Sequence, residues 1–144
     1  MPPFSPDSSC MIPALLPEHA HHTRAVSAIN RHLWAGNSMV IVAHTILETY
    51  SALTRMPVPS RVLPHDALQG IERTFLAQGR VAALGAQEYV QLLQEMANDR
   101  TLGGQVYDAA IVACARQAGV EVILTFNERH FRRFEGGGRT VEVP

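Results

Sequence analysis

Residues 103–131 read GGQVYDAAIVACARQAGVEVILTFNERHF and combine an apolar segment that carries a single carboxylate with a glycine and a short β-branched run. From Val106 to Ala115 every residue except Asp108 is apolar or aromatic, so we expect a helix that is buried along almost its whole length. A carboxylate in such a helix must be paired, hydrogen-bonded or bound to a metal. Asp108 is therefore predicted either to cap the start of this helix or to take part in a site.

The second half of the stretch predicts a strand that ends in polar residues. Gly119 is expected to end the helix, and Val122–Leu124 is typical of a short buried parallel strand. Thr125 and Asn127 follow the strand at its carboxyl end. That end is where open α/β sheets place their sites.

Helices and strands alternate in the same way along the rest of the chain. The hydrophobic spacing predicts further strands at 39–43, 81–84 and 140–143, and longer helices at 18–34, 45–56, 64–78 and 87–98. Strands that alternate with helices indicate an α/β sandwich around a parallel sheet. No linker long enough to separate domains interrupts the pattern, so we expect a single domain over residues 1–144.

The composition excludes two classes of protein. The chain has 144 residues, 47% of them hydrophobic, which suffices for one buried core, and no apolar run is long enough to cross a membrane. We therefore expect a soluble, cytoplasmic protein. The formal net charge of -1 excludes binding of nucleic acid through overall positive charge. The chain contains no lysine. An arginine cluster near the C-terminus could form a solvated face or could bind RNA or an acidic partner: Arg129, Arg132, Arg133 and Arg139.

A set of polar residues is predicted at strand ends or in first helical turns: Asp7, Glu48, Asp108 and Asn127. Each has a structural explanation of its own, since Asp7 and Asn127 fit N-cap positions and Glu48 lies at capping-box spacing from Thr45. These explanations leave open why the groups should share one edge of the sheet. Carboxylates gathered together raise one another's pKa unless a cation neutralises them. Oxygen ligands without cysteine or histidine suit Mg²⁺ or Mn²⁺.

These residues and their order resemble a known family, the PIN-domain nucleases, and within it the VapC-type toxins of bacterial toxin–antitoxin pairs. The strongest match is YDAAIVACARQAGVEVILTFNERHF, which is similar to the family's aspartate-led helix, strand and Thr-Phe-Asn-x-x-His-Phe turn. Weaker matches are Pro6-Asp7-Ser8-Ser9 for the first acidic motif and Glu48 in the helix after the second strand. The segment 57–99 matches only in its order of elements.

The resemblance implies a fold, a reaction and partners. The fold is a three-layer α/β/α sandwich with a five-stranded parallel sheet. The activity is that of an Mg²⁺- or Mn²⁺-dependent endoribonuclease, expected as a homodimer that is neutralised by a small VapB-like antitoxin. Such an ion activates water for in-line attack on an RNA phosphodiester, which leaves a 5′-phosphate and a 3′-hydroxyl.

The resemblance also assigns the site residues by position. The acidic, metal-binding and catalytic set consists of Asp7, Glu48 and Asp108. Asn127 takes a fourth position of this set, where aspartate also occurs in the family, and its neutral side chain would weaken a second metal site. Ser8 and Thr125 supply hydroxyls to the water shell of the metal or to phosphate.

One departure from the family lies at the N-terminus. The segment MPPFSP stands where the family has an apolar strand before the first aspartate. Because proline donates no ladder hydrogen bond, we expect this strand to be very short or to begin outside the ladder.

Other classes fit less well. A phosphoryl-accepting receiver domain relies on a lysine, which this chain lacks, and a haloacid-dehalogenase-type phosphatase needs an aspartate where Ser9 stands. The group His19, His21 and His22 could bind a transition metal, since His19 and His22 share a helix face, but an exposed polar helix start explains these histidines better. The remaining alternative is a catalytically silent PIN domain that binds RNA or protein.

Overall fold

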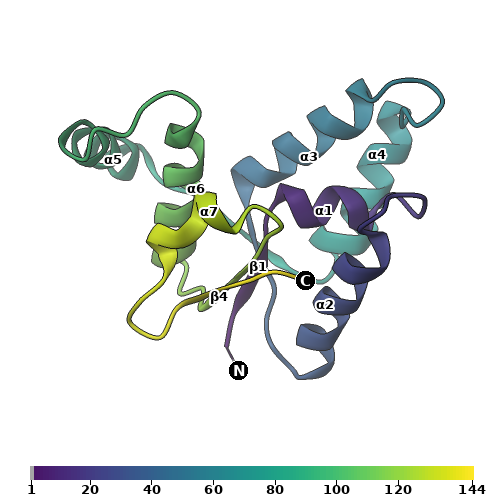
Figure 1. Cartoon of the computed structure of the whole chain (residues 1–144), viewed down its shortest axis with the longest axis horizontal. Helices are drawn as coiled ribbons and strands as arrows, with labels where there is room; N and C mark the ends of the chain where they lie inside the picture. Colours follow the sequence, from purple (N-terminus) through teal and green to yellow (C-terminus); the bar gives the residue numbers. More distant parts are fainter. Residues whose placement is uncertain (1) are drawn as a thin grey trace.

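The strands of the computed structural model, which describes residues 2–144, are short and all parallel (Figure 1). They are β1 (Phe4–Pro6), β2 (Val40–Val42), β3 (Arg80–Ala82), β4 (Val122–Leu124) and β5 (Thr140–Glu142). β4 pairs with β1 and β5, and β2 pairs with β3. An isolated parallel bridge between Phe4 and Met39 sets β1 beside β2, which gives the order β3-β2-β1-β4-β5. The five parallel strands of residues 2–144 therefore form two hydrogen-bonded sheets, of three and two strands, instead of one continuous sheet.

Pro6 explains why the ladder is interrupted between β1 and β2. The Asp7 N–H donates to the Leu124 carbonyl of β4 at 3.0 Å, whereas the Phe4 N–H donates to the Ser38 carbonyl on the β2 side at 2.9 Å. Successive N–H groups of a strand point to alternate sides, so the nitrogen of Pro6 faces β2 and carries no hydrogen to donate. The expected very short first strand is thus confirmed, with Phe4, Ser5 and Pro6 paired to β4.

In the part of the chain that the structure describes, seven α-helices surround the strands. They are α1 (Ser8–Ala14), α2 (His22–Trp34), α3 (Ala43–Arg55), α4 (Pro64–Ile71), α5 (Ala86–Asn98), α6 (Gln105–Gln117) and α7 (Glu128–Phe131). A π-helical segment, Glu72–Leu76, continues α4, and a 3₁₀ turn, Arg132–Phe134, continues α7. The helix expected from residue 18 begins later, at His22, because residues 16–22 form turns closed by backbone hydrogen bonds.

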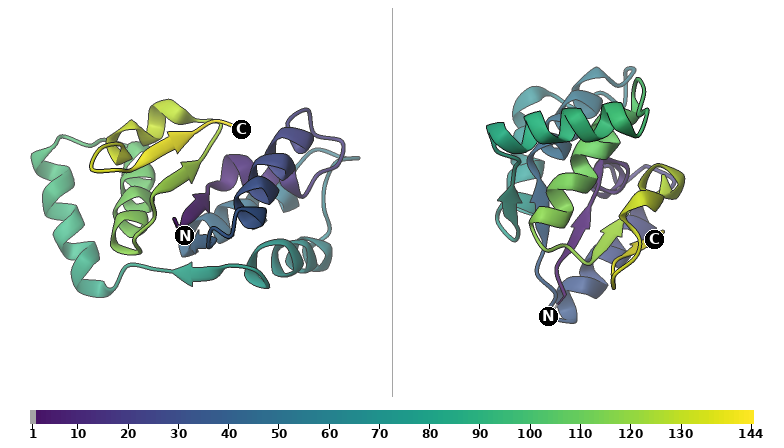
Figure 2. Two further views of the ribbon diagram at one scale, coloured as in Figure 1. Left: turned by 90° about the horizontal axis from the view of Figure 1, so that it is seen from below. Right: turned by 90° about the vertical axis from the view of Figure 1, so that its left-hand side faces the viewer.

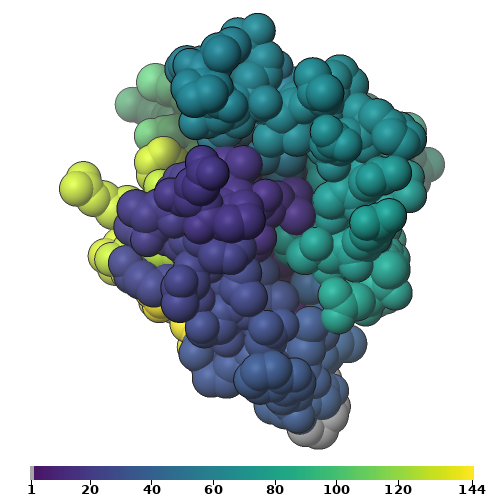
Figure 3. Space-filling model, turned by 90° about the vertical axis from the view of Figure 1, so that its right-hand side faces the viewer, coloured from purple at the N-terminus to yellow at the C-terminus, as the bar shows by residue number. Residues whose placement is uncertain are grey.

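Alternate strand residues face opposite helical layers. On β2, Ile41 packs in a core with Met11 of α1 and Ile29 of α2, whereas Val40 and Val42 pack on the other face with the α6 residues. Figures 1 and 2 show α1 and α2 on one side of the strands and α6 and α7 on the other. The predicted three-layer α/β/α sandwich is therefore confirmed. Figure 3 shows the outer face formed by α1 to α4, with α1 and the start of α2 in purple and dark blue.

The start of α6 is less buried than its sequence predicts. Ala109, Ile111, Val112, Cys114 and Ala115 are buried, in line with the apolar run. In the first turn, however, Tyr107 is 57% exposed, and the Asp108 side chain is 22% exposed. The expectation of burial along almost the whole helix is therefore wrong at this end, because the first turn of α6 extends past the strands to the edge where the site lies.

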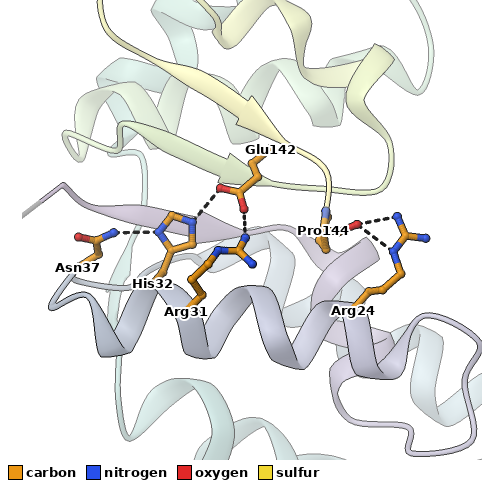
Figure 4. Close-up of polar contacts among 6 residues, drawn as sticks. All are labelled: Arg24, Arg31, His32, Asn37, Glu142 and Pro144. Carbon is orange, nitrogen blue, oxygen red and sulfur yellow. Dashed lines mark hydrogen bonds and ion pairs between the residues drawn. The ribbon is translucent and has the colours of Figure 1, made fainter.

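Polar contacts from α2 hold the C-terminal strand in place (Figure 4). Glu142 of β5 accepts from the Arg31 guanidinium and is paired with His32, whose Nε2 lies 2.9 Å from Oε2. Arg24 donates through Nε and Nη2 to the Pro144 carbonyl oxygen, at 2.9 and 2.6 Å. These contacts fix the free edge of the sheet beside α2. Within residues 2–144, no helix has both the length and the apolar character required of a membrane span.

Candidate active site

The predicted site residues lie at the edge where the strands have their carboxyl ends. Asp7 follows β1 directly and Thr125 follows β4 directly, and these two strands are paired in register. β2 runs without a loop into α3, which carries Glu48. Asp108 lies in the first turn of α6. Because β2, β1 and β4 are neighbours, this topology brings side chains from four separate parts of the sequence to one edge.

Asp7 is the most buried of the carboxylates and is held by hydroxyl groups. It is 5% exposed, and its two oxygens accept hydrogen bonds from Ser9 Oγ at 2.6 Å and from Thr125 Oγ1 at 2.8 Å. Asp7 occupies the N-cap position of α1, but it makes no side-chain capping hydrogen bond. Its carboxylate is therefore aimed at the loop after β4 and does not serve as a helix cap.

The same two hydroxyls shape the loop that follows β4. Ser9 Oγ accepts from the Phe126 N–H at 2.9 Å, and Thr125 Oγ1 accepts from the Asn127 N–H at 2.9 Å. The Phe126 ring stacks on His21, with 4.4 Å between the ring centroids. The loop is thus fixed to α1 and to the start of α2. The sequence did not predict this role of Ser9, which was part of the first acidic motif without a function assigned to it.

Burial makes the charged form of Asp7 costly. It raises the pKa of this carboxyl group from 3.8 to about 6, against the lowering effect of the Ser9 and Thr125 hydrogen bonds, and the negative charge of Glu48 raises it further. An anion in this position is stabilised by any cation that approaches its oxygens.

Glu48 has a buried oxygen without a partner. Its Oε1 atom is buried and accepts no hydrogen bond, while Oε2 lies 3.8 Å from Nε2 of His44, one turn earlier in α3. Burial raises the pKa of Glu48, His44 lowers it, the charge of Asp108 raises it again, and the Ser8 hydroxyl lowers it. The capping-box interpretation is wrong, because α3 begins at Ala43 and Thr45 Oγ1 donates to the Val42 carbonyl instead.

Asp108 is paired with a histidine that the sequence interpretation did not assign. Nδ1 of His130, on α7, lies 3.0 Å from Oδ2 of Asp108. The His130 side chain is 60% exposed and the Asp108 side chain 22%. The pair is therefore open to solvent, and His130 holds Asp108 at the rim of the site. The spacing of His130 from Asn127 in the Thr-Phe-Asn-x-x-His-Phe turn was the available signal.

Asn127 and Ser8 take peripheral positions. Asn127 is exposed and precedes α7 at its N-cap position, where it makes no side-chain capping hydrogen bond. Ser8 is half-buried and lines an open groove of about 630 Å³ together with Glu48, His44, Tyr107 and Arg55. Asn127 thus occupies the predicted N-cap position, but the predicted capping hydrogen bond is not formed. Ser8 lines the same groove as Glu48.

The donor chemistry of the site fits a hard divalent cation. The carboxylates of Asp7, Glu48 and Asp108 supply oxygen donors. The charge of Glu48 raises the pKa of Asp7, and the charge of Asp108 raises the pKa of Glu48. The unpartnered Oε1 of Glu48 is a buried acceptor that a cation would satisfy. Among residues 2–144, no three His, Cys, Asp or Glu side chains already form a coordination group. The residues therefore fit such an ion by their chemistry, without a complete coordination shell in place.

The structure is a parallel α/β sandwich in which carboxylates from three segments of the chain lie at one edge of the strands. These two features place the chain among small α/β proteins with an acidic site. The chain belongs to the PIN-domain family, whose family model, "PIN domain", matches residues 5–137.

Individual relatives agree with this assignment. Ribonuclease VapC40 of Mycobacterium tuberculosis is 33% identical over 123 residues, which cover 83% of this chain and 84% of that protein. The crystal structure of VapC20 from M. tuberculosis, titled a sarcin-ricin loop cleaving toxin, has a TM-score of 0.67 at 18% identity and covers 90% of this chain and 94% of its own. VapBC2 from Rickettsia felis, bound to a DNA fragment from its promoter, gives 0.64 at 13% identity, with 98% of both chains covered. The two structures support the fold alone.

Proposed function

We propose that this protein is a divalent-metal-dependent endoribonuclease toxin that hydrolyses RNA phosphodiesters in the cytoplasm. The observation that carries the proposal is the buried, unpartnered Oε1 of Glu48 beside the carboxylates of Asp7 and Asp108. The kinship with ribonuclease VapC40 supports RNA as the substrate. Mg²⁺ and Mn²⁺ are the ions that these oxygen donors favour.

Each side chain of the site has its own role in the proposed reaction. Asp7, Glu48 and Asp108 hold the cation, which when bound polarises a phosphoryl oxygen and lowers the pKa of water. Ser9 and Thr125 orient Asp7, and His130 orients Asp108. Water then attacks phosphorus in line with the leaving 3′-oxygen, which takes up a proton. The products are a 5′-phosphate and a 3′-hydroxyl.

Two further residues act around the acidic set. Ser8 lines the groove beside Glu48, so its hydroxyl can bind a water of the metal shell or a phosphate oxygen. Asn127 offers an amide near Thr125, whose Oγ1 already accepts the Asn127 N–H. Because an amide is neutral, Asn127 would hold a second cation only weakly, so the proposal needs one ion.

A cellular experiment tests the function directly. Wild type and the Asp108→Asn variant are induced separately without antitoxin, and the 5′ ends of cellular RNA are sequenced. New 5′-phosphate ends at defined sites are expected with wild type and should be missing with Asp108→Asn, which keeps the fold because its side chain stays at the rim. Identical RNA ends in the two samples would support the alternative, a catalytically silent PIN domain that binds RNA or protein.

The His130 contact predicts a smaller effect on cleavage. His130→Ala removes the group that holds Asp108, and loss of such a supporting contact costs about 10- to 100-fold in activity at metal sites. Stability should change by less than about 1 kcal/mol because the pair is solvent-exposed. RNA cleavage rates and thermal melting measure the two effects, with His65→Ala, an exposed histidine of α4, as the matched control. Wild-type cleavage by His130→Ala would rule out this positioning role.

We propose a VapB-like antitoxin as the partner that neutralises the enzyme. Support comes from the similar fold of VapBC2 from Rickettsia felis, whose crystal structure is that of the protein bound to a DNA fragment from its promoter. Co-expression of the gene for such a small protein with this chain should suppress RNA cleavage and give a stable complex.

The exposed face of α5 predicts that the protein forms a homodimer. Of this helix only Leu92 is buried, while Val90 and Leu93 are 60% and 64% exposed, and α5 lies at the outer end of the molecule (Figure 1). An apolar helix face of this kind is stabilised when a second copy covers it. Light scattering should therefore give a dimer for wild type and a monomer for Leu93→Glu. Leu68→Glu, on α4, is the control, and a monomeric wild type would contradict the prediction.

A further inference from the structure

A stacked pair of aromatic side chains separates two hollows at the rim of the candidate active site. The rings of His44 and Tyr107 lie parallel, with 5.5 Å between their centroids and 4° between their planes. Both residues line the open groove that contains Glu48, and both also line a second hollow of about 200 Å³. The pair therefore forms a wall that is shared by the open groove and the second hollow.

The second hollow differs in chemistry from the groove. It lies between α5, α6 and the start of α3, and its lining is almost wholly apolar, including Leu84, Leu92 and Val106. Tyr89 of α5 adds a further aromatic ring to this lining. Such a hollow suits a flat, apolar ligand and gives no place to a phosphate or a metal ion.

Each of the two residues of the shared wall has an acidic residue of the site as its neighbour. His44 lies 3.8 Å from Glu48, and Tyr107 is the residue before Asp108. More than half of Tyr107 is exposed, although His44 stacks against its ring. Arg55, the last residue of α3, lines the same groove and offers a cation that can bind a phosphate. A ligand that fills both hollows would thus place an anionic part in the groove and a flat part in the hollow.

We propose that the hollow behind His44 and Tyr107 binds one unpaired nucleobase of the RNA. The phosphodiester next to this base lies in the open groove beside Glu48. This inference rests on the proposed ribonuclease function. A base can enter the hollow only when it is unstacked from its neighbours, so the substrate is a single strand or a loop and not a regular duplex. Contacts between bases and aromatic side chains tolerate all four bases, so the pocket selects for an unpaired base more than for its identity.

Binding of a fluorescent RNA tests the proposal without cleavage. The probe is a short single-stranded RNA with one 2-aminopurine, and the protein carries Asp108→Asn so that the RNA stays intact. Stacking against tyrosine quenches 2-aminopurine, so fluorescence should fall with the single strand and stay unchanged with the same RNA in a duplex. Adding Tyr107→Leu should remove the quenching and weaken binding by about tenfold, which corresponds to the loss of one stacked base.

Matched variants keep the result interpretable. Tyr107→Phe retains the ring and should bind as the parent does, and Tyr50→Leu, on α3 outside both hollows, should also leave binding unchanged. Ala110→Leu narrows the hollow while Tyr107 is intact, and it should weaken binding as Tyr107→Leu does. Melting curves show whether each variant is folded.

The outcomes separate this inference from the function on which it rests. Unchanged quenching and affinity in folded Tyr107→Leu and Ala110→Leu would overturn the inference, even if wild type cleaves RNA. If Leu93→Glu changes the affinity for the RNA and Tyr107→Leu does not, the hollow belongs to the interface between two copies. This result would overturn the inference as well. Quenching that depends on Tyr107, in a wild-type protein that cleaves no RNA, would support the base pocket and contradict the ribonuclease function.

Discussion

Asp7→Asn is expected to abolish RNA cleavage and at the same time to stabilise the protein at neutral pH. Cleavage should fall at least about 100-fold, because a neutral amide gives up the charge that holds the cation, and such interactions contribute several kcal/mol to the transition state. Stability should rise because Asn fills the same space and carries no charge to bury.

The pH dependence follows from the raised pKa of Asp7. Its value in the folded protein, about 6, lies above the value of 3.8 for an unperturbed aspartate, so the folded state binds the proton more tightly than the unfolded state does. The free energy of unfolding should therefore fall as the pH rises through this window, and stay level with respect to Asp7 at higher pH. A shift of this size corresponds to about 3 kcal/mol, and we expect about 1–3 kcal/mol because the structure can relax.

Denaturation of wild type and Asp7→Asn at about pH 4 and about pH 7 measures this effect. The two proteins should differ little at the lower pH, where Asp7 is protonated in the folded protein and about half protonated in the unfolded chain, and Asp7→Asn should be the more stable at the higher pH. A divalent cation should stabilise wild type at neutral pH and not Asp7→Asn. Equal stability at both pH values would contradict the burial of a costly charge at this position.

Glu48→Gln is the second variant with a large expected effect. It should reduce cleavage at least about 100-fold, because the loss of one negative ligand weakens the stabilisation of charge in the transition state. It should preserve the fold, since the substitution relieves the repulsion with Asp108 and the buried Oε1 has no hydrogen bond to lose. Cleavage assays and melting curves with added Mn²⁺ should show loss of activity and a smaller rise of the melting temperature with the ion.

A matched variant separates this effect from a general loss of charge. Glu72 is an exposed glutamate next to α4, outside the site, so Glu72→Gln should cleave RNA as wild type does. Full activity of Glu48→Gln would remove Glu48 from the metal-binding set.

The order of elements was predictable because local patterns specify it. Val122–Leu124 forms a strand with the predicted bounds, and α6 covers the apolar run from Val106 to Ala115 that predicts a helix. Burial along α6 was not predictable from its apolar residues alone. Whether Tyr107 is covered depends on how far the strands extend beneath the helix, and this depends on pairing between distant segments.

The positions of Asp7, Glu48 and Asp108 could be predicted, and the contacts that hold them could not. The hydrogen bond between Ser9 and the Phe126 backbone joins residues far apart in the sequence, as does the pair of Asp108 with His130. The capping box failed for a local reason, since β2 continues directly into α3 and Thr45 lies inside the helix. Pairing across the sheet edge is a tertiary property, so residue spacing within a single helix or strand carries no information about it.

One measurement tests the central claim, that Asp7, Glu48 and Asp108 hold a divalent cation for RNA hydrolysis. Purified protein is incubated with single-stranded RNA in chelator, and then with Mg²⁺ or Mn²⁺ in excess over the chelator. No cleavage is expected in chelator, and either ion should restore cleavage that yields 5′-phosphate ends. Cleavage that continues in chelator would contradict a role of the cation in RNA hydrolysis.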